Sequence, residues 1–202
     1  DERVSTIMSA SPTAVYTSDD ISRVLELMIG RGLGFLPVVN HEGGVEGVIT
    51  EHDVVMLLTE RKIGVKASEI MTSTIVTVSV EDPLGKAAET MVKHGFRRLV
   101  VVSGDVVEGS ISAKGFVELF SSGKAYTFLK STNINDILET PVSEAVERNY
   151  ITASEDSDVG EICNLMKETR LNWVLVTRGE EVVGIVTERD ILVALALENT
   201  RT

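Results

Sequence analysis

The sequence predicts an α/β (α+β) fold built from three tandem copies of one small unit. The first observation is a repeated stretch: GVITEHD, beginning at Gly47, returns as GIVTERD, beginning at Gly184. The second is one helical pattern that occurs three times, and the third is a pair of β-rich runs after each of these helices. Repetition of this kind is typical of proteins made of repeated supersecondary units.

The first helix of each copy is amphipathic, with apolar residues at offsets 0, +3, +4 and +7. The three stripes are Ile21, Val24, Leu25 and Met28; Leu84, Ala87, Ala88 and Met91; and Val159, Ile162, Cys163 and Met166. Serine and acidic residues precede each stripe, as is typical of helix N-termini. Cys163 has the same register as Leu25 and Ala88, so we expect a small buried hydrophobic residue rather than a nucleophile or a metal ligand.

A β-hairpin follows each of these helices. The paired runs are FLPVV with GVEGVIT, RLVVV with VVEGSIS, and WVLVT with EVVGIVT, and a glycine-containing turn joins each pair. A second helix begins after the TEHD, SAKG or TERD element, over residues 54–58, 116–120 and 191–197. With a short strand before the first helix, each copy has the order β-α-β-β-α over about 55 to 65 residues.

The repeats define the expected domains. Repeat one covers residues 1–62, repeat two 63–124, and repeat three 133–202 with a short insertion near 140–148. The boundaries between repeats lie in polar connectors at 60–68 and 121–133. Units this small are marginally stable alone, so we expect them to pack in pairs, sheet on sheet, with repeat one on repeat two. Repeat three then needs the third repeat of another chain, which predicts at least a homodimer, unless its insertion covers the open face.

Composition excludes several classes of partner. The formal net charge of −12, from 31 acidic and 19 basic residues, opposes binding to nucleic acid, so an anionic ligand must be held by local amides and a few cations. The apolar runs are too short and too often interrupted by charge to span a membrane. A single cysteine excludes an internal disulfide framework and fits a reducing interior. These features predict a cytoplasmic protein that binds neither nucleic acid nor membrane.

The threonine and aspartate of the repeated stretch admit two interpretations. Thr50 with Asp53, and Thr187 with Asp190, have the spacing of a capping box, in which two side chains satisfy amides of the first helical turn. The alternative is a ligand site, which the recurrence of the stretch favours. The histidines do not have metal-ligand spacing on one element, so we expect no metal site.

In register, these motifs resemble the CBS domain, first described in cystathionine β-synthase. They are the hydrophobic-Pro-Val-Val run at residues 36–39, its counterpart at 99–102, and Gly-hydrophobic-hydrophobic-Thr/Ser-x-x-Asp. The resemblance covers nearly the whole chain in three repeats. It implies a regulatory sensor in which two repeats pair into a Bateman module, with two equivalent sites for AMP, ADP, ATP or, less often, S-adenosylmethionine.

The resemblance also assigns the ligand-binding residues. Asp53 and Asp190 would accept hydrogen bonds from the ribose hydroxyls, and Thr50 and Thr187 would contact ribose or phosphate. A carboxylate accepts two neighbouring hydroxyl donors well, and the adjacent helix N-terminus offers amides to phosphate. Thr50 and Asp53 would then cap the helix in the empty site and bind a ribose in the full one.

An apolar wall would hold the adenine in each repeat. In repeat one it contains Val15, Phe35 and Pro37; its equivalents contain Ile75 in repeat two and Trp173 in repeat three. Most of these positions would be core in any case. Trp173 in particular could stack on adenine, seal a subunit contact or serve packing alone, and packing is the preferred interpretation.

Repeat two departs from the family pattern. It reads GSISAKG, so Gly115 stands at the aspartate position, although Ser112 remains. The same repeat carries Arg97 and Arg98 where the others have Gly-Phe and Asn-Trp. In family members, basic residues at this place meet the phosphates of the ligand, which implies the same role for these arginines.

Two function classes compete with a ligand sensor. An enzyme is not expected, because no catalytic triad ordering, nucleophile elbow or phosphate-binding loop occurs and the repeats account for every long segment. A ligand-free scaffold, serving oligomerisation or docking to a regulated enzyme or transporter, stays open. We expect a sensor without catalytic residues or a required cofactor, which acts when an adenine nucleotide shifts the population of two repeat orientations.

Overall fold

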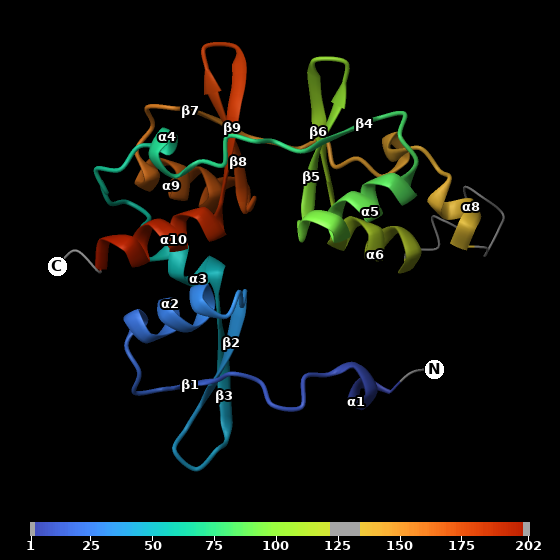
Figure 1. Cartoon of the computed structure of the whole chain (residues 1–202). Helices are drawn as coiled ribbons and strands as arrows, with labels where there is room; N and C mark the ends of the chain where they lie inside the picture. Colours follow the sequence, from blue (N-terminus) through green and yellow to red (C-terminus); the bar gives the residue numbers. More distant parts are fainter. Residues whose placement is uncertain (1–2, 122–133, 200–202) are drawn as a thin grey trace. The chain divides into compact units, whose positions relative to one another are not determined.

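The computed structural model describes residues 3–121 and 134–199, and the order β-α-β-β-α occurs three times in it (Figure 1). Repeat one contains β1 (Val15–Tyr16), α2 (Ile21–Gly30), β2 (Phe35–Val39), β3 (Val45–Thr50) and α3 (Glu51–Met56). Repeat two contains β4 (Thr77–Ser79), α5 (Leu84–His94), β5 (Arg98–Ser103), β6 (Val106–Ser112) and α6 (Ala113–Ser121). Repeat three contains β7 (Thr152–Ser154), α9 (Val159–Thr169), β8 (Trp173–Arg178), β9 (Glu181–Thr187) and α10 (Glu188–Asn199).

Short helical segments precede the repeats. They are α1 (Val4–Ile7) before repeat one, α4 (Ala67–Ile70) before repeat two, and α8 (Ile134–Leu138) with the 3-10 turn η1 (Val142–Glu144) before repeat three. The expected connector at 121–133 lies outside the described residues apart from its first position. No helix in the described part of the chain is long and apolar enough to cross a membrane.

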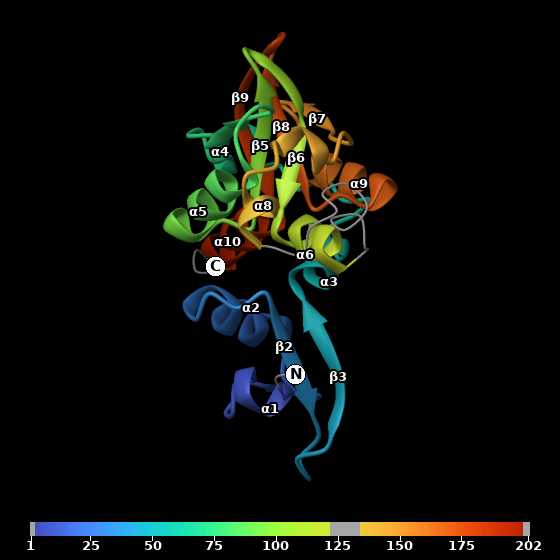
Figure 2. The same cartoon turned by 90° about the vertical axis from the view of Figure 1, so that its right-hand side faces the viewer.

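The three sheets share one topology, which confirms the predicted unit. In each, the first strand pairs in parallel with the second, and the second pairs antiparallel with the third, so β3, β6 and β9 are edge strands (Figure 2). The hairpin register also repeats, placing Phe35 opposite Thr50, Arg98 opposite Ser112, and Trp173 opposite Thr187. Equivalent positions in the three repeats can therefore be compared directly.

The second helices begin earlier than the sequence patterns predict. The expected starts were residues 54, 116 and 191, whereas α3, α6 and α10 begin directly at the ends of the strands before them, at Glu51, Ala113 and Glu188. The threonine or serine that ends each strand donates or accepts hydrogen bonds in the first turn, so no loop separates strand from helix.

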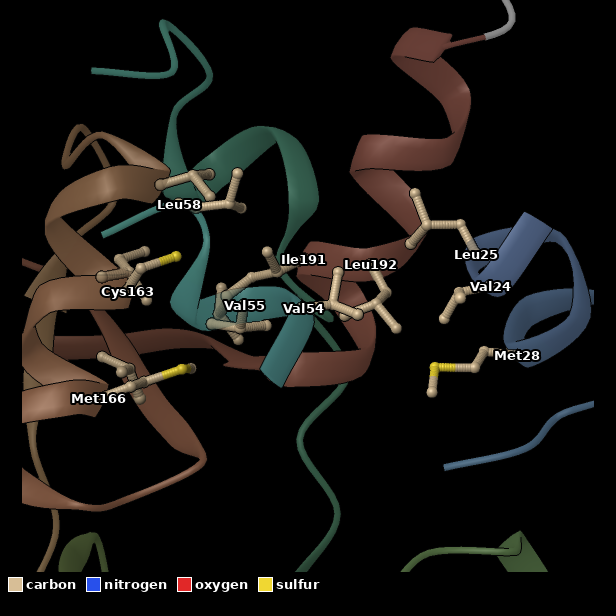
Figure 3. Close-up of a cluster of buried hydrophobic side chains, with 14 of the residues drawn as sticks. Val24, Leu25, Met28, Val54, Val55, Leu58, Cys163, Met166, Ile191 and Leu192 are labelled. Atoms are coloured by element: carbon tan, nitrogen blue, oxygen red, sulfur yellow. The ribbon is translucent and has the colours of Figure 1, made fainter. Parts of the chain in front are cut away.

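The chain forms two compact units, one up to Ser73 together with Ile151 onward, and the other from Thr74 to Tyr150. The first unit combines repeat one with repeat three. Their shared core brings α2 and α3 together with α9 and α10, and Figure 3 shows Leu25, Val54 and Cys163 among the side chains around Ile191 and Leu192. Helices, rather than sheets, make this contact.

The sequence predicted sheet-on-sheet pairing of repeat one with repeat two, and that pairing stays a prediction; the contact between repeats one and three is made by helices. The apolar stripes of α2 and α9 are alike in all repeats, so periodicity alone does not say which copies meet. In the structure, α10 of repeat three contacts both α2 and α3 of repeat one. Repeat three therefore has its helical partner within the same chain.

The first residues of α3 and α10 pair crosswise. Glu51 forms an ion pair with Arg189 at 2.6 Å, and His52 Nδ1 lies 2.7 Å from Glu188 Oε1. Arg189 also donates to the carbonyls of Met28 and Leu33. Both glutamates are buried, with 6% and 7% of their surface exposed. The repeated T-E-x-D stretch thus joins repeat one to repeat three.

The second unit has a separate core. Val78, Leu84, Met91, Leu99 and Ile111 pack together with Ile137 and Val142, which belong to α8 and η1. The segment before repeat three therefore completes repeat two. In the first unit the segment before repeat two does the equivalent for repeat three, because Ala67 is buried in that core and Thr72 pairs with Ile185 of β9.

We expect Arg189→Leu to lower the free energy of unfolding by about 2–3 kcal/mol, because it removes the cation beside the buried Glu51 carboxylate. Arg23→Ala is the matched control, since Arg23 pairs with Glu26 on the surface of α2 and exposed pairs contribute about 1 kcal/mol or less. Urea unfolding followed by circular dichroism measures both. Equal effects of the two substitutions would contradict the structural importance of the crosswise pairs.

Cys163 should resist thiol reagents in the folded protein. Its side chain is fully buried in the shared core, as the sequence predicted, and burial raises the pKa of the thiol to about 12. We expect negligible reaction with Ellman's reagent at neutral pH and one equivalent after unfolding in guanidinium chloride, because the thiolate is the reactive species. Rapid reaction in the native state would show that the shared core opens.

Candidate functional site

Thr50 and Asp53 form a closed capping box at the start of α3. The Asp53 Oδ2 atom accepts from the Thr50 amide at 2.8 Å and from the Thr50 hydroxyl at 2.6 Å, and the Asp53 amide donates back to the Thr50 Oγ1 atom. The Thr50 hydroxyl is the main cause that holds the pKa of Asp53 below its ordinary value. Asp53 is therefore an anion at neutral pH, with its carboxylate fixed on the helix.

Thr187 and Asp190 repeat this geometry at the start of α10. Asp190 Oδ2 accepts from the Thr187 amide at 2.7 Å and from its hydroxyl at 2.6 Å. The second carboxylate oxygen, Oδ1, accepts from the hydroxyl of Thr72, which arrives on the segment before repeat two. Asp53 Oδ1 accepts no corresponding bond from the described residues. Asp53 and Asp190 thus share the capping-box geometry, and they differ in the hydrogen bonding of their Oδ1 atoms.

Repeat two holds a carboxylate at the same place, although its helix lacks the aspartate. The Ser112 hydroxyl donates to Glu147 Oε1 at 2.6 Å, and a Cβ added to Gly115 would lie 3.0 Å from that oxygen. Glu147 comes from the segment before repeat three, whose backbone pairs with Ser110 of β6. Sequence analysis missed this residue. The insertion near 140–148 was the one signal that pointed to it.

The adjacent arginines of repeat two differ in their surroundings. Arg98, opposite Ser112 in the hairpin, donates to Ser110 Oγ at 2.6 Å and to Glu147 Oε2 at 3.0 Å. Arg97 is exposed, and its carbonyl accepts from the amide of Ala113 at the start of α6. Arg98, Ser112 and Glu147 therefore form one polar cluster, and Arg97 lies at its edge.

The expected adenine walls vary between the repeats. Phe35, opposite Thr50, has 59% of its surface exposed, whereas Trp173, opposite Thr187, has 1%. Val15 is buried, and Pro37 and Ile75 are half-buried. The Trp173 ring is covered by the protein, which agrees with a packing role. Repeat one instead presents an exposed aromatic ring beside its hydroxyl and carboxylate.

The arrangement suits binding rather than covalent chemistry. Each of the three clusters offers a carboxylate that can accept hydrogen bonds and a hydroxyl that can donate or accept one. Within the described ranges, no group of three His, Cys, Asp or Glu residues could hold a metal ion. The two clusters of the first unit lie at the starts of α3 and α10, the helices joined by the crosswise pairs.

Known proteins match this sequence over most of its length. A 33.4 kDa protein in the ribosomal RNA operon of Thermofilum pendens is 35% identical over 91% of this chain, and the match spans 61% of that protein. The MJ1225 protein of Methanocaldococcus jannaschii is 29% identical over 95% of this chain and 69% of its own length. This chain thus spans about two thirds of these relatives.

Solved structures share the fold. The crystal structure of MJ1225, described as a putative archaeal homologue of g-AMPK, superposes with a TM-score of 0.83 at 28% identity, covering 96% of this chain and 71% of that one. The CBS domain pair of the MJ0100 protein, solved with 5′-methylthioadenosine and S-adenosyl-L-methionine, superposes with a TM-score of 0.53 at 22% identity, over 65% and 99% of the two chains.

The sequence also matches the CBS domain at residues 4–60, 67–122 and 142–197. These ranges contain the strands of the three β-α-β-β-α units, their helices apart from the last two residues of α10, and the hydroxyl residues Thr50, Ser112 and Thr187. Because the matches make up most of the chain, the protein belongs to the CBS-domain family.

Proposed function

We propose that this chain is a regulatory module that binds an adenosine-containing ligand, such as AMP, ADP or ATP, through the ribose. The observation that carries the proposal is the recurrence of one hydroxyl and carboxylate pair at 2.6 Å in all three repeats. In repeat two the pair is retained even though its carboxylate comes from another segment. Helix capping by the repeated motif alone does not explain that replacement.

The pairs have the chemistry that a ribose needs. The 2′ and 3′ hydroxyls are neighbouring donors, and an ionised carboxylate accepts both through its two oxygens. In repeat one, Asp53 Oδ1 has capacity for such a donor, and the exposed ring of Phe35 lies across the hairpin from Thr50. Repeat one therefore offers the most complete set for a nucleoside, with an aromatic face for the base.

The relatives support this choice of ligand class. The MJ1225 protein, 28% identical in the superposed structures, is described as a putative archaeal homologue of g-AMPK. Separately, the resemblance of the repeats to the CBS domain implies AMP, ADP or ATP as the ligand. S-adenosylmethionine remains a second ligand to test. The negative charge of the chain disfavours free anions, so the ribose contacts must supply much of the affinity.

Repeat two would use Glu147 in place of a helix aspartate. Its carboxylate already accepts from Ser112, and Arg98 next to it could turn from Glu147 to the phosphate of a ligand. Arginine suits phosphate because its donors form a planar fork. If a ligand phosphate replaced Glu147 as the partner of Arg98, ligand binding would also act on the segment that carries Glu147.

Ligand binding would act by population shift. A nucleotide can change the preferred arrangement of repeats only by its difference in affinity for the two arrangements. In the first unit, Asp53 and Asp190 directly follow the residues that pair crosswise between repeats one and three. A ligand contact at either aspartate would therefore act on the residues that join repeats one and three.

A ligand-free scaffold is the second candidate function. The observation that favours it is that both capping boxes and Arg98 are already satisfied by the protein itself. A scaffold would use the repeats for oligomerisation or for docking to a regulated enzyme or transporter. Absence of any binding heat with AMP, ADP, ATP and S-adenosylmethionine at millimolar concentrations would select it.

We expect Asp53→Ala and Asp190→Ala each to weaken nucleotide binding at one site by at least about tenfold, which corresponds to about 1.4 kcal/mol. The reason is the loss of charge-assisted hydrogen bonds to the ribose. Isothermal titration calorimetry measures affinity and stoichiometry. Asp20→Ala is the matched control, since Asp20 caps α2 outside these clusters. Equal binding by wild type and both site variants would mean that the ligand lies elsewhere.

The effect of Gly115→Asp should depend on Glu147. In the wild type, the new carboxylate would lie near that of Glu147, and we expect a loss of about 1 kcal/mol in the free energy of unfolding, because like charges repel. In a Glu147→Ala background, the aspartate would restore the partner of Ser112 and raise stability by about 1 kcal/mol. Urea unfolding of the four proteins measures this. The same sign in both backgrounds would show that Glu147 does not occupy the aspartate position.

A further inference from the structure

Two strand positions of the hairpin are polar in repeat two and apolar in the other repeats. Arg98 and Ser110 occupy them, and Ser110 is fully buried with its hydroxyl 2.6 Å from the Arg98 guanidinium. The equivalent residues are Phe35 and Val48 in repeat one, and Trp173 and Ile185 in repeat three. Because apolar residues fill both positions in the other repeats, the fold itself does not require this polar pair.

The helix that follows the hairpin also differs in charge. In repeats one and three, α3 and α10 each begin with a glutamate and have an aspartate two residues later. The first turn of α6 has no acidic residue and contains Lys114. A helix N-terminus has a partial positive charge, which acidic residues in the first turn offset. In repeat two, the negative charge beside this helix start must come from another segment.

Glu147 supplies that charge from the segment before β7. Its Oε1 atom accepts from Ser112 at 2.6 Å, and its Oε2 atom accepts from Arg98 at 3.0 Å. Two backbone hydrogen bonds with Ser110 hold its segment on β6, so the carboxylate is the part that can leave. The pair is open to solvent, because 22% of the Arg98 side chain and 32% of the Glu147 side chain are exposed. An anion from solution can therefore reach the place that this carboxylate takes.

We propose that Glu147 is an internal competitor that makes repeat two selective for ligands with a phosphate group. A phosphate and the Glu147 carboxylate repel each other, so a phosphate binds Arg98 by displacing the Oε2 atom. That oxygen is then released to accept from the hydroxyls of a ribose. The ribose part of this proposal rests on the proposed function, whereas the competition for Arg98 does not.

A nucleoside without a phosphate gains less at this site. Its ribose must take the Oε2 atom of Glu147 from Arg98, and it offers no anion in exchange. Separating a partly buried cation from its carboxylate is costly. A nucleotide replaces the carboxylate with a phosphate, whose oxygens match the planar donors of arginine. Repeat two should therefore prefer AMP to adenosine, and the preference should depend on Arg98.

Inorganic phosphate tests the competition without a nucleoside. We expect Glu147→Gln to bind phosphate at least about tenfold more tightly than wild type, because the neutral amide does not repel the anion. A second substitution, Arg98→Gln, should remove this gain. Glu108→Gln is the matched control, since Glu108 pairs with Arg148 and its side chain is also 32% exposed.

Isothermal titration calorimetry measures these affinities, and thermal unfolding shows that each variant is folded. A gain for Glu147→Gln alone, lost again with Arg98→Gln, would support the proposal. No gain for Glu147→Gln, or an equal gain for Glu108→Gln, would overturn it.

Calorimetry with AMP and adenosine tests the selectivity. Asp53→Ala together with Asp190→Ala weakens the two sites of the first unit and leaves repeat two to be measured. In this background we expect AMP to bind at least about tenfold more tightly than adenosine. Arg98→Gln should abolish the difference, and Arg148→Gln, the matched control, should keep it.

The two proposals fail in distinguishable ways. Equal affinities of repeat two for AMP and adenosine would overturn the selectivity while leaving the proposed function intact. Binding of neither ligand by any variant, together with the phosphate gain of Glu147→Gln, would contradict the proposed function and support the competition for Arg98.

Discussion

The crosswise pairing of α3 with α10 is the constraint on which the first unit depends. Each helix begins with a glutamate, and each glutamate finds its partner at the second position of the other helix: Glu51 with Arg189, and Glu188 with His52. Two helix N-termini that meet bring like partial charges together, and acidic residues in their first turns offset this. The pairing also fixes Met28 and Leu33, through Arg189, against repeat three. The same few residues thus start two helices and join two repeats.

The carboxylate in repeat two shows that a site is set by geometry rather than by a local motif. Glu147 reaches Ser112 from a different segment, and Gly115 leaves the space that its carboxylate fills. Two changes that look unrelated in the sequence, a missing aspartate and a short insertion, compensate each other in space. Loss of a motif residue in one repeat therefore does not imply loss of its chemical group.

The sequence was sufficient for the unit and insufficient for its partners. Apolar periodicity and hairpin signals predicted the β-α-β-β-α order and the burial of Cys163, because they depend on neighbours in the chain. The sheet-on-sheet pairing of repeats one and two stays a prediction, and the helical contact between repeats one and three was not foreseen, since helices with near-identical stripes can pack on any copy. Glu147 was missed for the same reason: its contact with Ser112 joins residues that no local pattern relates. Thr50, Asp53, Thr187 and Asp190 were predicted as pairs, and their pairing geometry is present; their role toward a ligand stays a proposal.

The capping boxes and their carboxylates lie next to the crosswise pairs of α3 and α10. The proposed ligand would therefore act on the packing of repeats one and three. Asp53 directly follows His52 and Glu51, so a ribose that draws the Asp53 carboxylate outward must also act on the first turn of α3. That turn carries one half of each crosswise pair, and the buried glutamates tolerate little displacement because an unpaired buried charge is costly. The junction would therefore keep its pairs and transmit the change as a shift between repeats one and three. In repeat three, Thr72 holds the outer oxygen of Asp190, so a ligand there must first displace a protein hydroxyl. The two proposed sites of this unit therefore differ, and we expect the one in repeat one to bind ligand first.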